Sequence, residues 1–162
     1  MKTRWPKKNI NDFEKNSDLV ALRKSLLSIY DLNFTSQEHS IIDTGMLAEF
    51  YCKKLFSLKS PKVWNGSFDA ETMDGKEKIE IKSRRTRIKN DKIACPLGMK
   101  VKEKIDWLFY VFFNEDFTLR SILAFHNDAI TRLKNGRVSF KTAFDEKKYE
   151  TIYDDASGMK HG

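Results

Sequence analysis

The sequence predicts an α/β domain of the α+β kind, in which helices flank a mixed β-sheet. Three observations predict it. Two early stretches have helical apolar spacing, an Asp74-Gly75 pair separates two strand-like segments, and residues 106–113 are almost wholly apolar. With 162 residues, 40% of them hydrophobic, the chain is long enough to bury a proper core. We therefore expect one domain over residues 1–162.

The two predicted helices come early in the chain. The first runs from a Ser17 cap through residues 18–30, and its apolar stripe consists of Leu19, Leu22, Leu26 and Ile29. The second begins near Asp43 or Thr44 and runs on toward Pro61, which forbids its continuation because proline lacks the backbone N–H that a helix needs.

Strands follow the helices. Residues 62–65 and 67–72 have the composition of strands, and Asp74-Gly75 is a strong signal for a two-residue hairpin turn. Residues 76–84 would form the returning strand. The sequence therefore predicts an antiparallel hairpin around this turn.

The centre of the predicted sheet is the segment 106–113, because a strand that is apolar on both faces must be covered on both sides. A turn at 114–116 leads to an antiparallel partner at 118–125. A third helix then begins at an Asn127 cap and ends at Asn135-Gly136.

The two ends of the chain carry weaker patterns. Residues 1–15 are basic and irregular, which predicts an N-terminal arm. Trp5 in this arm is expected to cover part of the core; stacking on a nucleobase is the less favoured alternative. Residues 145–162 mix charges without a pattern, and a sheet edge, a dimer contact and a loose tail all remain open for them.

Positive charge is concentrated in one part of the chain. Residues 76–104 hold eleven basic and four acidic side chains, an excess of seven that equals the net charge of +7 for the whole chain. Such a concentration is typical of proteins that bind a polyanion. A solvated face that only aids solubility is an equally good explanation of charge alone.

Several classes of protein are disfavoured. Cys52 and Cys95 lie far apart, and the three histidines are scattered, so no zinc-site spacing is present. The sequence has no signal-like segment and no apolar run long enough to cross a bilayer. We expect a cytoplasmic protein with no membrane partner.

The hairpin brings together residues that suit metal chemistry. Glu80 and Lys82 lie two residues apart in a predicted strand, so their side chains share one face, and Asp69 comes near them from the other arm. Two converging carboxylates repel each other unless a cation lies between them. Mg²⁺ suits this position because it takes oxygen ligands and needs only one or two carboxylates.

Two further side chains fit this interpretation. Lys82 would help to orient or deprotonate a metal-bound water, and it would stabilise charge that develops on a phosphate. Glu49 is the only carboxylate in the apolar stretch 45–52, and it would add a further acidic group from the second helix.

A purely structural explanation exists for the same residues. Alternating charges on one strand are common on an exposed sheet face, where they form weak cross-strand ion pairs; here these residues are Lys78, Glu80, Lys82 and Arg84. Glu71 and Asp74 are also near enough in sequence to replace Asp69 as the partner of Glu80. Together, Glu49, Asp69 and the basic excess favour the functional interpretation.

The residues resemble a known family. The helix "LAEFYCKKLF", the "FD" before the hairpin, the "EIK" after it and the hydrophobic strand look like the PD-(D/E)XK nuclease superfamily, over roughly residues 40–135. The resemblance implies a restriction endonuclease-like mixed β-sheet flanked by helices. It implies that Asp69, Glu80 and the Ile81 carbonyl bind Mg²⁺ and that Lys82 is catalytic. Glu49 resembles the glutamate that many members of the family add from a helix, and it would complete the catalytic metal site.

The function implied by the resemblance is a Mg²⁺-dependent DNA endonuclease that hydrolyses phosphodiester bonds with a metal-activated water, most like a small type II restriction endonuclease. Double-stranded DNA would be held by Arg84, Arg85, Arg87 and Lys89. Cutting both strands calls for a homodimer. Two alternatives remain: a repair or recombination nuclease for branched or damaged DNA, and a binding module that does not cut.

Overall fold

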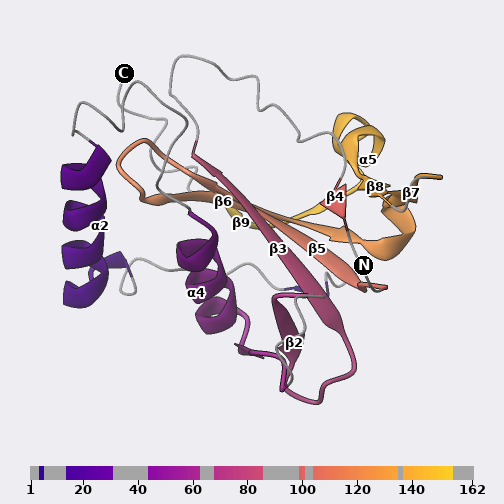
Figure 1. Ribbon diagram of the computed structural model, residues 1–162, viewed down its shortest axis with the longest axis horizontal. Helices are drawn as coiled ribbons and strands as arrows, with labels where there is room; N and C mark the ends of the chain where they lie inside the picture. Colours follow the sequence, from indigo (N-terminus) through magenta and orange to yellow (C-terminus); the bar gives the residue numbers. More distant parts are fainter. Residues whose placement is uncertain are drawn as a thin grey trace.

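The structure is a computed structural model that describes residues 4–5, 14–30, 44–62, 68–85, 99–100, 104–134 and 137–154. It confirms the predicted fold class, since helices flank a six-stranded mixed β-sheet (Figure 1). Apart from Lys62, which lies in a bend, the strand predicted at 62–65 lies outside the described residues.

The main sheet has the order β1-β2-β3-β5-β6-β9. Neighbouring strands are antiparallel except for β3 and β5, which are parallel. The strands are β1 (Leu58–Lys59), β2 (Ala70–Thr72), β3 (Lys78–Arg85), β5 (Trp107–Phe113), β6 (Leu119–His126) and β9 (Glu150–Asp154). A small antiparallel sheet has the order β4-β8-β7 and consists of β4 (Met99–Lys100), β8 (Arg137–Ser139) and β7 (Thr131–Arg132).

Strand β5 is central, as predicted, and every residue in it is buried. Its side chains alternate between two hydrophobic cores. The helix-side core joins Trp107, Phe109, Val111 and Phe113 to residues of the two long helices. The small-sheet core joins Leu108, Tyr110 and Phe112 to Val138, Phe140 and Ala143.

The two long helices are α2 (Ser17–Tyr30) and α4 (Gly45–Leu55), and α4 packs against β3. The predicted cap of α2 is wrong by one residue, because Oδ1 of Asn16 accepts the N–H groups of Asp18 and Leu19 at 3.0 and 3.2 Å. The predicted stripe of α2 is only partly right. Leu19 is buried and Leu26 packs on the core, but Leu22 and Ile29 are exposed.

The second helix ends earlier than predicted. It stops at Leu55, and Ser57 adopts a left-handed conformation with φ 52°, so the chain turns well before Pro61. Leu58 and Lys59 then form β1, which pairs with β2 at the edge of the sheet. The apolar Leu58 that sequence reasoning placed in the helix is buried from this strand.

The helix predicted from Asn127 is wrong. A single 3-10 turn, η1 (Asn127–Ala129), follows β6, and the side chain of His126 caps it. Ile130 is already extended, and β7 then pairs with β8 across a turn in which the Leu133 N–H donates to the Arg137 carbonyl at 2.8 Å. The described residues therefore continue as strand where β-branched Ile130 and Thr131 favour it.

The β2-β3 hairpin forms as predicted, but its loop is longer than two residues. The Gly75 N–H donates to the Thr72 carbonyl at 2.8 Å, and the Thr72 N–H donates to the Glu77 carbonyl at 3.1 Å. Four residues therefore separate Thr72 from Glu77. Gly75, at φ 71°, supplies the left-handed residue that this turn requires.

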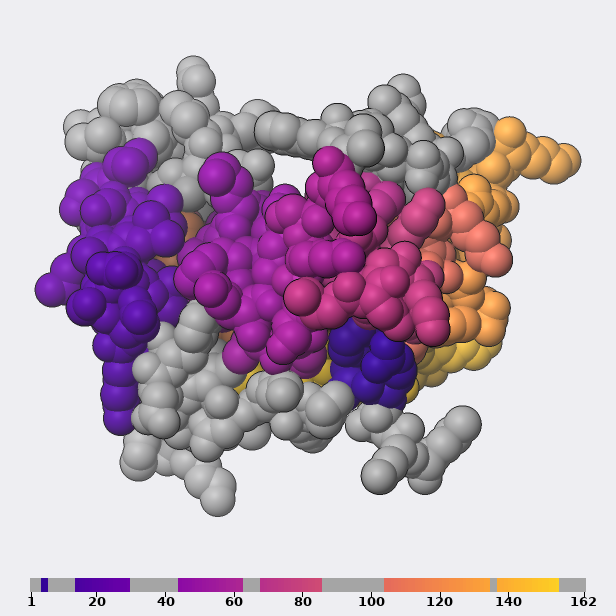
Figure 2. Space-filling model, turned by 90° about the horizontal axis from the view of Figure 1, so that it is seen from below, coloured from indigo at the N-terminus to yellow at the C-terminus, as the bar shows by residue number. Residues whose placement is uncertain are grey.

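Both ends of the chain contribute to the body of the protein. Trp5 is buried, as expected, and makes edge-to-face contacts with Phe56, Trp107 and Phe109. Figure 2 shows residues 4–5, in dark indigo, against the magenta hairpin, where Arg4 pairs with Glu77. Toward the C-terminus, helix α5 (Lys141–Asp145) precedes β9, so the sheet-edge alternative is correct for Glu150–Asp154.

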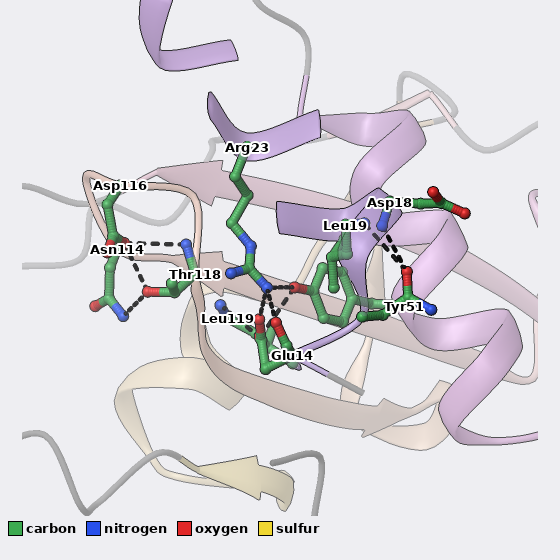
Figure 3. Close-up of polar contacts among 10 residues, drawn as sticks. Glu14, Asp18, Leu19, Arg23, Tyr51, Asn114, Asp116, Thr118 and Leu119 are labelled. Atoms are coloured by element: carbon green, nitrogen blue, oxygen red, sulfur yellow. Dashed lines mark hydrogen bonds and ion pairs between the residues drawn. The ribbon is translucent and has the colours of Figure 1, made fainter. Parts of the chain in front are cut away.

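A polar network ties the N-terminal segment to both long helices (Figure 3). Glu14 accepts the Tyr51 hydroxyl at 2.9 Å and the Leu119 N–H at 3.2 Å, and its second oxygen pairs with Arg23. Both members of the ion pair are mostly buried. Burial raises the pKa of Tyr51 to about 12, against the opposing charge of nearby Arg23. Tyr51 therefore acts as a neutral donor here.

None of the helices in the described part of the chain is long and apolar enough to span a bilayer.

The Glu14 network generates a stability prediction. We expect Glu14→Gln to lower the free energy of unfolding by about 2–3 kcal/mol, because Arg23 would keep its buried charge and lose its counter-charge. Urea unfolding measures the change. Glu146→Gln, on an exposed side chain, is the matched control, and we expect it to change stability by less than about 0.5 kcal/mol. Equal stabilities for the two variants would contradict a structural role for the network.

Candidate active site

The hairpin holds Asp69 against β3. Ala70 lies opposite Ile79 in the ladder, and the Asp69 N–H continues it by donating to the Ile79 carbonyl at 3.1 Å. At the next position of β3 that faces β2, the Asp69 side chain takes the place of a backbone acceptor, because its Oδ2 accepts the Ile81 N–H at 2.8 Å. The carboxylate is therefore fixed just before β2 begins, beside the middle of β3.

Glu80 and Lys82 share one face of β3, as predicted. They lie opposite Leu108 and Tyr110 of β5, so they project on the side of the small-sheet core. The Lys82 Nζ lies 2.5 Å from the Glu80 Oε1, and the Lys82 side chain is 38% exposed. Glu80 itself is only 8% exposed. An ordinary solvated sheet face does not bury a glutamate in this way. The purely structural explanation, which assumes that this face is exposed, therefore does not fit Glu80.

The two carboxylates are electrostatically coupled. Burial raises the pKa of Asp69, although the Ile81 N–H and the charge of Lys82 oppose it. Burial also raises the pKa of Glu80; Lys82 opposes this shift, and the negative charges of Asp69 and Glu49 add to it. In both residues, desolvation outweighs the stabilising partners. Because the charged forms of Asp69 and Glu80 are both disfavoured here, a bound cation would stabilise them.

Glu49 lies at the edge of this group. Its Oε2 accepts from the Lys53 Nζ at 2.9 Å, one turn further along α4. The charge of Glu49 raises the pKa of both Asp69 and Glu80, and the charge of Lys53 lowers that of Asp69. The pKa of the buried Cys52 thiol, also on α4, is raised mainly by burial and further by the charges of Glu49 and Asp69. Helix and hairpin thus contribute to one electrostatic site.

The two alternative acids lie elsewhere. Asp74 is exposed at the hairpin loop, where its Oδ1 accepts from the Thr72 hydroxyl at 2.6 Å and the Lys76 N–H at 3.1 Å. Glu71 pairs with Lys59 of β1 at 3.4 Å. The negative charges that raise the pKa of Glu80 include those of Asp69 and Glu49. The structure therefore favours Asp69 over Glu71 and Asp74.

The donor set suits a magnesium ion held by two carboxylates. Asp69 and Glu80 offer hard oxygen ligands, and the Ile81 carbonyl points to the same edge as its N–H, where Asp69 lies. Among the described residues, however, no three Asp, Glu, His or Cys side chains come together as a metal site. Glu49 is engaged by Lys53 and is not assembled with the other two carboxylates into such a cluster.

The predicted DNA-binding residues have different surroundings. Arg84 is half-buried and shares its face with Glu80 and Lys82. Arg85 lies on the other face, 4.8 Å above the Phe117 ring, and its Nη1 donates to the Glu115 carbonyl at 3.4 Å. Its contacts thus support the turn between β5 and β6. Arg87 and Lys89 lie outside the described residues.

Sequence reasoning overlooked Lys53. The signal was present, because Glu49 and Lys53 have the i,i+4 spacing that places opposite charges side by side on a helix. Only the packing of α4 beside the hairpin brings this pair to Asp69.

No family model matches this chain, and no curated protein matches it significantly.

The raised pKa of Glu80 generates a prediction about pH. Its protonated form is favoured in the folded protein, so its contribution to stability is complete below its ordinary pKa of 4.5 and is lost as the pH rises through the raised value. We therefore expect Glu80→Gln to unfold at higher urea concentration than the wild type at pH 7.5, with the difference vanishing near pH 4. Glu115→Gln, in an exposed turn, is the control. A Glu80→Gln variant that is less stable at pH 7.5 would contradict this account.

Proposed function

We propose that the protein is a Mg²⁺-dependent nuclease that hydrolyses phosphodiester bonds of DNA. The observation that carries the proposal is the convergence of Asp69 and Glu80, two mostly buried carboxylates whose pKa values are raised, beside the half-exposed Lys82. Perturbed carboxylates next to a lysine are typical of hydrolytic metal sites.

Each residue has a distinct role in this proposal. Asp69 and Glu80 would hold Mg²⁺, which supplies an activated water and stabilises charge on the phosphate when bound. The ammonium of Lys82, which lies beside Glu80, would contact the scissile phosphate or orient the water. Glu49 would complete the acidic site from the helix side, kept in place by Lys53.

The type of nuclease is a further part of the proposal. A type II restriction endonuclease acting as a homodimer on double-stranded DNA is the form that the sequence resemblance favours. The basic segment between β3 and β5 supports a polyanionic substrate. Comparing cleavage of linear duplex, branched and single-stranded DNA separates this form from a repair or recombination nuclease.

Lys82 tests the catalytic role. We expect Lys82→Met to reduce Mg²⁺-dependent cleavage of plasmid or phage DNA by a factor of about 10²–10³, because a charge that stabilises the transition state is lost. Lys76→Met changes an exposed lysine in the loop of the same hairpin, and we expect it to cut like the wild type. Gel analysis with and without EDTA gives the readout. Intact DNA in every lane, together with a gel shift at low salt, would favour the binding module.

Metal binding is testable without any cleavage. We expect saturating Mg²⁺ to raise the melting temperature of the wild type. A ligand that binds only the folded protein stabilises it by about 2.7 kcal/mol when its free concentration is 100 times its Kd. Asp69→Asn should abolish this shift, because it removes one of two charged ligands. Asp74→Asn, at the exposed loop, should retain it. A shift that survives Asp69→Asn would place the ion elsewhere.

A further inference from the structure

A hollow of about 240 Å³ lies beside the small sheet, at the end of the main sheet where β5 begins. Its apolar wall consists of Ile105, Ile130 and Val138. Lys104 and Arg132 line it as well. Figure 1 shows the small sheet at the end of the molecule opposite to α2. The hollow is smaller than the ~300–1,000 Å³ pockets that hold drug-sized ligands, so it suits one small ring system.

The cations of the hollow differ from most lysines near the main sheet. Lys53, Lys59 and Lys82 each pair with a glutamate. Lys104 and Arg132 are exposed, and neither forms an ion pair with any other described residue. Among the described residues that line the hollow, the acid is Asp128, whose side chain is 88% exposed and lies 3.1 Å from His126 Nδ1. The hollow therefore keeps a local positive charge.

An unpaired amide also lies in the lining. The Oδ1 atom of Asn127 is buried and has no hydrogen-bond partner among the described residues. The backbone of Asn127 is held firmly, because its N–H donates to the Asp106 carbonyl at 2.9 Å. Because this oxygen is shielded from solvent, a rotation of the Asn127 side chain toward the hollow would be needed for a ligand there to supply the missing hydrogen bond.

We propose that this hollow binds one unpaired nucleotide of a nucleic-acid strand. The apolar wall takes the face of the base, the Asn127 amide turns toward the hollow to bond its polar edge, and Lys104 and Arg132 hold the adjoining phosphates. Lys134, also exposed and without an ion pair among the described residues, lies just beyond Arg132 in sequence. Cations spread in this way suit a chain of phosphates better than a single free nucleotide.

The bound nucleic-acid strand could continue from the hollow toward the candidate active site. Lys78, Glu80 and Lys82 share one face of β3, and the Lys78 N–H donates to Asp106 Oδ2 at 2.8 Å, next to the start of the hollow. The face that carries Lys82 thus leads toward the hollow. This path rests on the proposed function, whereas binding at the hollow does not.

Binding of a fluorescein-labelled single-stranded DNA 12-mer to the full chain tests the proposal, by anisotropy in EDTA so that cleavage plays no part. We expect Lys104→Gln/Arg132→Gln to weaken binding about tenfold or more at low salt and to reduce the salt slope by about 1–2. Lys24→Gln, on an exposed lysine of α2 at the other end of the molecule, should bind like the wild type. Unchanged affinity in the double variant would overturn the proposal.

The role of the base is tested separately. Asn127→Ala should weaken binding of the ordinary 12-mer several-fold and leave binding of an abasic 12-mer unchanged. Equal losses for both strands, or displacement of the 12-mer by equimolar mononucleotide, would overturn the assignment of the hollow to a nucleotide within a strand. A protein that binds in this way but never cleaves DNA would refute the proposed function and keep this inference.

Discussion

The burial of β5 on both faces is the constraint on which the rest of the structure depends. Its seven residues are all buried, so the sheet must be covered on both sides. Trp5, α2 and α4 cover one face, and the small sheet with α5 covers the other. Because β3 pairs directly with β5 along seven residues, the residues of the candidate site on β3 are held against the fully buried strand.

The candidate site contains buried charges that their partners compensate only in part. The fold buries Asp69 and Glu80 near each other, and the available partners do not fully compensate the loss of hydration, as the raised pKa values show. The Glu14 network differs, because there a glutamate and an arginine are buried as a pair and complete a structural link between segments. An acidic group that is poorly compensated is more consistent with binding an ion than with stabilising the fold.

Local patterns were sufficient where one physical factor dominated. The apolar segment 106–113 had to be a covered strand, and alternation along β3 placed Glu80 and Lys82 on one face. Local patterns failed where competing factors were similar in strength. Helical spacing after Asn127 competed with the β-branched pair Ile130 and Thr131, and pairing with β8 decided the outcome. The segment before Pro61 likewise became β1 by pairing with β2.

The sequence by itself determined the fold class, the central strand, the hairpin and the identity of Asp69, Glu80 and Lys82 as candidate partners, because strand periodicity and turn chemistry act over a few residues. Only the tertiary structure decided that Glu80 is buried, that Asp69 and not Glu71 or Asp74 lies beside it, and that Lys53 holds Glu49. These features depend on strand register and on the packing of α4, which bring together groups distant in sequence and remove them from water.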